Sequence, residues 1–243
     1  GKADAIYIKS NDKNILIDSG DTDTKDQVIQ YLNNNKIQQF DLIIATHPHK
    51  DHIAGMDNII NTFSINRFIM PKLSETIIPT TKTYNSMINS LKDNNITVES
   101  PVVRDNFKIG EINIDILGPI KEYDNLNNNS VIAKLAYKNT SFLFVGDAEK
   151  EAETDLISSG ANLKSTVLKV GHHGSKTSTT QKFLNAVNPE YSVISVGPDS
   201  NNLPKDSIIN RLKNNNIKTY RTDKSGTIIF TSDGDNINVF TEK

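Results

Sequence analysis

The sequence predicts an α/β fold, built as a four-layer αββα sandwich of two mixed sheets with external helices. Two observations support this prediction. The same order of elements occurs twice, in pseudo-repeat halves of about 1–120 and 121–243, and each half contains a strand that is apolar throughout (Ile15–Ile17 and Phe142–Val145). Because a strand with two apolar faces must be covered on both sides, two sheets packed together with helices outside satisfy both observations.

The first half begins with a predicted hairpin, whose strands at 5–9 and 14–21 are joined by a short polar turn. A helix at about 23–32 and a strand at 42–45 should follow. The strand leads directly into a polar cluster, His47–His52.

The second half repeats this order. A hairpin of 131–137 and 141–147 precedes a helix at 149–157 and a strand at 166–170, which leads into His172–Gly174. We therefore expect the polar residues that follow these strands to meet at one edge, between the sheets: Asp18, Asp147 and the two histidine clusters.

The remaining elements fill the space between these units. Helices are expected at 81–91, 179–187 and 204–214, and Pro204 suits the first turn of the last one. Strands are expected at 67–70, 106–109, 112–117, 191–196, 226–231 and 236–240. No stretch rich in Gly, Pro or Ser separates the halves, so we expect a single domain over 1–243.

The composition excludes several classes of protein. The chain has no cysteine, which excludes disulfides and thiolate ligands and leaves a metal site only nitrogen and oxygen donors. A net charge of −2 gives no overall basic surface, so contacts to nucleic acid would have to be local. The sequence contains no apolar stretch long enough for a membrane span and no signal peptide.

The start of the chain bears on its location. Gly1 leads straight into a strand, so a preceding leader or anchor stays open. We expect an extracellular or cell-surface location in a bacterium, with the cytoplasm as the alternative. The oligomeric state is left open.

Metal-ligating residue types concentrate after the two equivalent strands. The segment Thr46–His52 holds three of the five histidines and Asp51, and Pro48 stiffens the backbone between two of them. Imidazole and carboxylate are ligands of Zn²⁺ and Mn²⁺. His172 and His173 hold the matching position in the second half, so we interpret all five histidines as one site rather than as core residues or a His-rich surface loop.

These residues resemble the metallo-β-lactamase superfamily, whose hallmark H-x-H-x-D-H is followed by an Asp and a later His. The segments 145–149, 168–178, 194–197 and 220–227 are similar to the ComEC-type competence family. In that family this domain is attached to a DNA-uptake channel and is regarded as a metal-dependent nuclease. Phosphorylcholine esterases of bacterial surfaces are similar in the same Gly-His-His-Gly-Ser stretch.

The resemblance implies two divalent ions, Zn²⁺ or Mn²⁺. The first would be held by His47 and His49, the second by Asp51, His52 and one of the later histidines, for which we favour His173, and Asp147 would bridge both. The superfamily's usual third histidine on the first ion is absent, because residues 125–129 read Asn-Leu-Asn-Asn-Asn. We expect the carbonyl of Asn128 or Asn129, or a water, in its place.

Several roles follow at such a site. Asp51 is expected to be both a ligand and the catalytic proton acceptor, and His172 to act as general acid or to bind a phosphate oxygen. Asp18 either orients a ligand histidine or caps the end of its strand. Residues 175–178 either contact phosphate or cap the next helix, and Lys169 is expected to be a surface charge.

The function expected from this pattern is hydrolysis of a phosphoester, with DNA as a possible substrate and a ComEC-like nuclease as the first candidate. A phosphorylcholine esterase is the alternative, for which Tyr84 or Tyr123 would have to supply an aromatic box. A β-lactamase is disfavoured by the missing third histidine. A non-catalytic scaffold is disfavoured because the ligand sequence is nearly intact.

Overall fold

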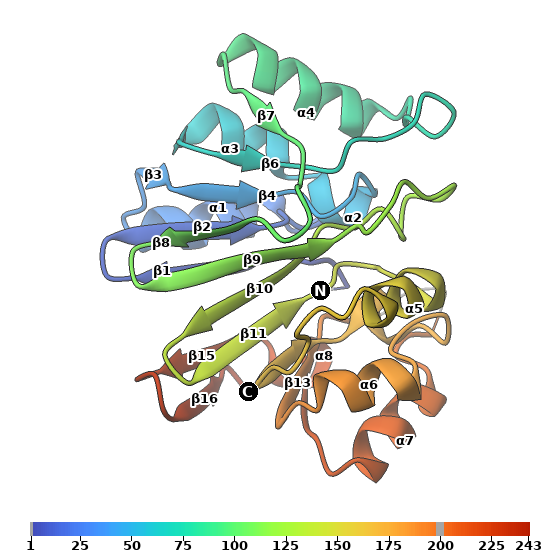
Figure 1. Ribbon diagram of the computed structural model, residues 1–243. Helices are drawn as coiled ribbons and strands as arrows, with labels where there is room; N and C mark the ends of the chain where they lie inside the picture. Colours follow the sequence, from blue (N-terminus) through green and yellow to red (C-terminus); the bar gives the residue numbers. More distant parts are fainter. Residues whose placement is uncertain (1, 198–201) are drawn as a thin grey trace.

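The computed structural model describes residues 2–197 and 202–243, and it confirms the predicted sandwich (Figure 1). A five-stranded sheet and a seven-stranded sheet form the two inner layers. Each sheet combines parallel and antiparallel pairs, and helices cover the outer faces.

The five-stranded sheet comes from the first half of the chain. Its strands, in spatial order, are β1 (Ile6–Ser10), β2 (Lys13–Ile17), β4 (Leu42–Ile44), β6 (Phe68–Ile69) and β7 (Val98–Glu99). A short parallel pair lies beside it, formed by β3 (Gln39–Phe40) and β5 (Ser64–Ile65). The helices of this half are α1 (Lys25–Asn34), α2 (Lys50–Ile53), α3 (Met56–Thr62) and α4 (Lys82–Asp93).

The seven-stranded sheet comes mostly from the second half. Its strands, in spatial order, are β14 (Lys218–Arg221), β13 (Tyr191–Ile194), β12 (Val167–Lys169), β11 (Thr140–Phe144), β10 (Ile132–Tyr137), β9 (Ile112–Gly118) and β8 (Asn106–Ile109). The helical segments are α5 (Lys150–Ser158), η1 (Gly171–Gly174), α6 (Gln181–Val187), α7 (Asp206–Asn214) and α8 (Thr222–Ser225). The last two strands, β15 (Ile228–Ser232) and β16 (Ile237–Thr241), pair only with each other.

Alternate residues of the inner strands enter different cores. Ile15 and Ile17 of β2 pack between the sheets against Ile114 and Ile116 of β9, whereas Leu16 packs on the other face of β2 among the helices of its own half. A third cluster packs α5, α6 and α7 onto the outer face of the larger sheet. The strand predicted to be apolar on both faces is therefore buried on both.

The internal repeat is also present in the structure. In the first half β1 pairs antiparallel with β2, and β2 pairs parallel with β4. In the second half β10 pairs antiparallel with β11, and β11 pairs parallel with β12. The segments that follow β4 and β12 meet at one edge of the sandwich, where His52 and His173 both face Asp147.

Several short elements of the structure were not predicted, among them α2, α3, α8, β3, β5, β7 and β14. α3 contains two isoleucines and two asparagines, which are weak helix formers, and burial of Met56, Ile59 and Ile60 stabilises it instead. β14 at the edge of the larger sheet was predicted only as part of a motif. The five predicted helices are present, with ends shifted by up to two residues.

Within the described residues, no helix combines the length and apolarity needed to span a bilayer.

Candidate metal centre

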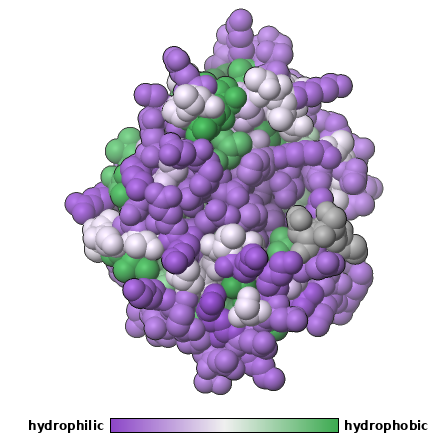
Figure 2. Space-filling model, turned by 90° about the vertical axis from the view of Figure 1, so that its right-hand side faces the viewer, coloured by the Kyte–Doolittle hydropathy of each residue, from purple (hydrophilic) through white to green (hydrophobic). Residues whose placement is uncertain are grey.

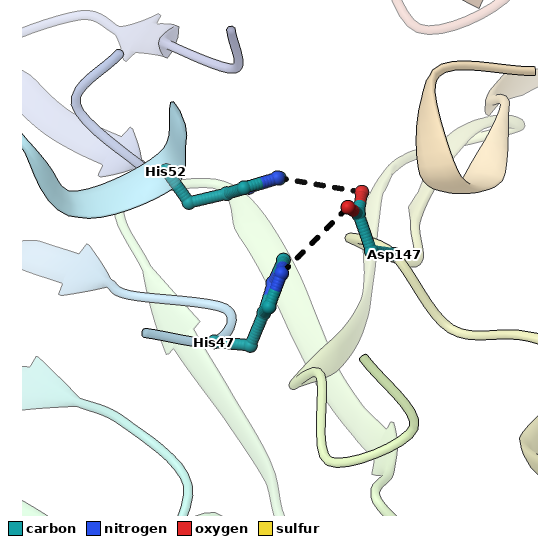
Figure 3. Close-up of side chains that lie close together, drawn as sticks. All are labelled: His47, His52 and Asp147. Atoms are coloured by element: carbon teal, nitrogen blue, oxygen red, sulfur yellow. Dashed lines mark ion pairs between the residues drawn. The ribbon is translucent and has the colours of Figure 1, made fainter. Parts of the chain in front are cut away.

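The structure brings the predicted site residues together at the edge where β4 and β12 end. Asp147 lies at the centre and is buried. Its Oδ1 is 3.3 Å from Nε2 of His52 and 3.6 Å from Nε2 of His173, and its Oδ2 is 3.7 Å from Nε2 of His47 and 3.8 Å from Nε2 of His172. Figure 3 shows His47 and His52 reaching Asp147 from the opposite half of the molecule. One carboxylate thus faces imidazoles from both halves.

Gly146 allows Asp147 to reach this position. Its φ of +52° lies in the left-handed region, which favours glycine. A Cβ here would lie 2.8 Å from Oγ of Ser130 and 3.0 Å from Cβ of Thr46. The amide N–H of Asp147 donates to the same Ser130 hydroxyl over 3.1 Å. The absence of a side chain at Gly146 therefore lets the two halves approach each other at the site.

The Asp18 carboxylate contacts the loop that carries the three histidines of the first half. Its carboxylate accepts hydrogen bonds from both the amide N–H and the hydroxyl of Thr46, each over 2.7 Å, and it lies 2.7 Å from Nδ1 of His52. The contact to Thr46 caps the strand end, and the contact to His52 turns Nε2 of that ring toward Asp147. The two roles that were left open for Asp18 are thus both present.

His47 and His49 face each other. Nε2 of His47 is 3.0 Å from Nδ1 of His49, with the two rings at a steep angle. Two ring nitrogens come this close when a proton or a cation lies between them. The clusters of three ligand atoms found among the described residues do not include His49, so its place on the first ion stays a prediction.

The adjacent histidines of η1 take different positions, although both have left-handed backbone conformations. Nδ1 of His173 is 2.9 Å from the carbonyl of Ser195, so it donates there, and Nε2 faces Asp51 Oδ2 at 3.4 Å. His172 remains partly exposed, and its Nδ1 lies 3.1 Å from Glu149 Oε1. The buried ring of His173 therefore faces the centre of the site, and His172 lies on its solvent-exposed side.

The ionisable groups of the centre shift one another's pKa values. Burial would lower the pKa of His52, but Asp147 and Asp18 outweigh burial and raise that pKa well above its usual value. Burial would likewise raise the pKa of Asp147, yet His52 and His173 hold it well below its ordinary range. Burial keeps the pKa of His47 well below the ordinary value, so that ring is in the neutral form that binds metals.

The donor atoms fit divalent ions. In the part of the chain that the structure describes, four triads have ligand atoms within 4.8 Å of one another: His47, His52 and Asp147; Asp51, His52 and His173; Asp4, Asp18 and His52; and Asp4, Asp147 and His173. Among the described residues, Nε2 of His52, Nε2 of His173 and Oδ1 of Asp147 are buried without a hydrogen-bond partner. Unpaired buried polar atoms are costly, and a bound cation would satisfy all three.

The side-chain oxygens of Asn128 and Asn129 accept hydrogen bonds from the main chain, so their part in the metal site stays a prediction. Oδ1 of Asn128 accepts from the amide of Glu149 over 2.9 Å, and Oδ1 of Asn129 accepts from the amide of Tyr123 over 3.1 Å. Both side chains thus stabilise the loop that carries them. Oδ1 of Asn127 is instead the buried oxygen of this run without a hydrogen-bond partner in the described chain.

The prediction for Lys169 was wrong. Its side chain is 3% exposed, and Nζ lies 2.9 Å from Oδ2 of Asp4, which is 1% exposed. β12 is an interior strand of the larger sheet, so a lysine on it has little access to solvent. The apolar run around Lys169 could have signalled this burial. Asp4, which lies beside the site, carried no signal because its partners are distant in sequence.

The loop of residues 175–178, which follows the histidines of η1, contains both buried and exposed hydroxyls. Ser178 is buried and donates to the carbonyl of Gly171 over 2.7 Å, so it stabilises the turn. The hydroxyls of Ser175 and Thr177 are exposed, and the Thr177 hydroxyl lies 3.3 Å from Nδ1 of His172. Figure 2 shows that the face near α2 and α5 is largely hydrophilic, as suits a polar substrate.

Comparison with known proteins places this centre in a family. The family model of the metallo-beta-lactamase superfamily matches residues 1–197, so the chain belongs to that superfamily. The chain is 29% identical to ComE operon protein 3 of Bacillus subtilis over 205 residues, and 26% identical to competence protein ComA of Neisseria gonorrhoeae over 235 residues. The matches cover 83% and 95% of this chain, and the predicted ComEC-type resemblance is confirmed.

The extent of these matches limits what they imply. The chain spans 26% and 31% of the length of the two competence relatives. Among solved structures, the metallo-beta-lactamase fold protein YhfI from Bacillus subtilis is similar, with a TM-score of 0.57 and 11% identity over 91% of this chain and 89% of that one. CmlA, a diiron beta-hydroxylase from Streptomyces venezuelae, has a TM-score of 0.61 and 10% identity over 98% of this chain and 52% of that one. The structural likeness concerns the fold alone.

Proposed function

We propose that this protein is a binuclear metal-dependent phosphodiesterase and, more specifically, a nuclease of the ComEC type. The observation that carries the proposal is the buried Asp147 carboxylate, which faces imidazoles from both halves with one oxygen unpaired. When bound, two divalent cations lower the pKa of a water and offset negative charge on phosphoryl oxygens.

Each ion would have its own set of ligands. His47 and His49 would hold the first ion, and Asp51, His52 and His173 the second, with Asp147 between them. Asp4, Asp18 and Lys169 lie beside these ligands, so the four aspartates and one lysine in and around the centre carry a formal charge of −3. Two divalent cations more than balance this charge, which leaves the centre attractive to one further anionic oxygen.

The protein's own groups would orient the substrate and move protons. Asp51 is partly exposed, so its carboxylate can both hold the second ion and accept a proton. His172 lies on the solvent-exposed side of the site, where Glu149 and Thr177 orient its ring. From there it would donate a proton to the leaving oxygen or hold a phosphate oxygen.

The names of two relatives favour a phosphodiester, and DNA in particular. One is called a competence protein, and the other, recombination protein 2 of Haemophilus influenzae, is named for recombination and is 28% identical over 235 residues. The donor set contains only imidazole and carboxylate, which suits Mn²⁺ as well as Zn²⁺. We therefore propose Mn²⁺ or Zn²⁺ as the ions and DNA as the first substrate to test.

The phosphorylcholine alternative is weakened by the position of one tyrosine. The ring of Tyr123 is buried, and its hydroxyl donates to Asp155 over 3.0 Å, so it is not available for an aromatic box. Tyr84 on α4 is the other tyrosine that was considered for this role. One aromatic ring is a poor cage for a quaternary ammonium.

The test uses chelator-treated protein to which Mn²⁺ or Zn²⁺ is returned. Substrates are single- and double-stranded DNA, bis(p-nitrophenyl) phosphate, p-nitrophenylphosphorylcholine and a chromogenic cephalosporin. We expect cleavage of DNA and of the generic diester. DNA cleavage should fall at least about tenfold between 50 and 200 mM salt, because phosphate contacts release counterions. Equal activity without metal, or cleavage of the cephalosporin alone, would refute the proposal.

A further inference from the structure

Asp4 and Lys169 form an ion pair behind the candidate centre that the proposed chemistry does not use. The two side chains are almost fully buried, and the distance between Oδ2 and Nζ is 2.9 Å. Nζ also donates to the carbonyl of Val170 over 3.1 Å. Burying two charges costs desolvation free energy that their attraction often does not recover, so such a pair is a poor source of stability. Its location suggests another role.

Asp4 contacts both halves of the molecule. Its amide N–H donates to the carbonyl of Asp51 over 3.1 Å, and its own carbonyl accepts from Gly20 over 2.7 Å. Its Oδ1 lies 3.8 Å from Nδ1 of His173 and has no hydrogen-bond partner among the described residues. Asp4 thus contacts the main chain of one candidate ligand and the ring of another.

These two ligands need an external support. Asp51 belongs to α2 of the first half, whereas His173 belongs to η1 of the second half and has a φ of +52°, which is unusual for a residue with a side chain. His47 and His49, in contrast, lie two residues apart on one loop, so their spacing is local. The second ion's ligands depend on how the halves are joined, and the first ion's ligands depend on it much less.

We propose that the Asp4–Lys169 pair is a positioning device for the second metal half-site, holding Asp51 and His173 at the spacing that one ion requires. Lys169 anchors the Asp4 carboxylate to β12, and the Asp4 main chain anchors α2. The carboxylate beside Nδ1 also favours a proton on that nitrogen, as the Ser195 carbonyl does, which keeps Nε2 free as a donor atom. This inference rests on the proposed metal centre.

The test compares Asp4→Asn, Lys169→Met and the double variant with wild type by calorimetric titration of the chelator-treated protein with Mn²⁺. Lys134→Met is the matched control, because Lys134 is also a buried lysine on the larger sheet but donates to the carbonyl of Asn162. Melting temperatures of the metal-free variants report on folding. We expect the first ion to bind as in wild type and the second ion to bind about 10- to 100-fold more weakly in both single variants. The control should bind both ions normally.

The direction in which each single variant changes the affinity for the second ion separates positioning from simple electrostatics. Removing a carboxylate near a cation weakens binding, whereas removing an ammonium strengthens it. If Lys169→Met tightens the second ion while Asp4→Asn loosens it, or if either variant binds both ions normally, the proposal is overturned. Equal loss of both ions would overturn it as well.

If a single variant does not fold, the double variant, which leaves no unpaired charge, carries the test, and weaker binding of the second ion alone is expected. Wild-type protein that binds no Mn²⁺ would refute the metal centre itself, before any variant is compared.

Discussion

The two halves of the molecule place an aspartate after equivalent strands, yet the two carboxylates have opposite surroundings. Asp18 follows β2, accepts hydrogen bonds from Thr46 and lies against Nδ1 of His52. Asp147 follows β11, and its Oδ1 has no hydrogen-bond partner in the described chain. One half therefore uses its aspartate to orient His52, and in the other half the buried aspartate faces the space where ions are proposed to bind.

The difference comes from where the backbone turns. Asp18 is itself in the left-handed conformation, with φ of +58°, and it is the first residue after β2. In the second half the left-handed residue is Gly146, and Asp147 is the third residue after β11. Because more residues separate Asp147 from its strand, Asp147 lies beyond the edge of the sheet. Asp18 lies directly at the strand end, against the loop that carries the first three histidines. A repeat of elements thus sets the position of the site, and the turn decides the role of each aspartate.

The largest effect is expected for Asp147→Ala. Because this carboxylate is the one proposed to touch both ions, its loss should reduce metal content from about two ions per chain to less than one and activity by at least about 100-fold. Elemental analysis of the purified variant checks the first expectation, and diesterase assays check the second. Unchanged metal content would rule out the bridging role.

The two histidines of η1 should separate binding from turnover. His173→Ala should lose the second ion, because its Nε2 faces Asp51 and Asp147. His172→Ala should keep both ions and lower turnover by about 10²- to 10⁴-fold, as for a missing general acid. Metal analysis and kcat of both variants give the comparison, and the opposite pattern would exchange the two roles.

Asp18→Asn tests the supporting role in the first half. The amide can still accept one hydrogen bond from Thr46, but it no longer pairs with Nδ1 of His52 as an anion. We expect metal affinity to fall by about 10- to 100-fold while both sites can still be filled at high metal concentration. Titration with Mn²⁺ measures this, and loss of binding as complete as in Asp147→Ala would mean that Asp18 is itself a ligand.

The comparison also shows what the sequence could predict. The αββα sandwich, the repeat and the convergence of His47, His52, Asp147 and His173 follow from local patterns, because a parallel strand delivers the residues after it to a known edge of the sheet. Hydrophobic runs and histidine spacing are both local properties. They need no knowledge of which distant segments meet.

Contacts between distant segments could not be predicted in this way. Lys169 was expected at the surface, since a lysine is rarely buried without a partner and its partner Asp4 lies at the other end of the chain. The carbonyl of Asn128 or Asn129, or a water, was expected to complete the first ion's ligands, and the structure adds that both side-chain oxygens accept main-chain hydrogen bonds. Only the tertiary structure determines which of several similar polar groups remains unpaired.

The smallest effect concerns the turn before Asp147. Gly146→Ala adds left-handed strain of about 1–2 kcal/mol and a Cβ that collides with Ser130 and Thr46, so it should lower the melting temperature and weaken metal binding together. Gly160→Ala, at the end of α5, is the matched control, because Gly160 has φ of +72° but open space around the new Cβ. It should cost about 1 kcal/mol of unfolding free energy and leave metal binding unchanged. If both variants lose stability equally and bind metal normally, the close approach of the halves at Gly146 does not position Asp147, and the turn would not explain why the two aspartates differ.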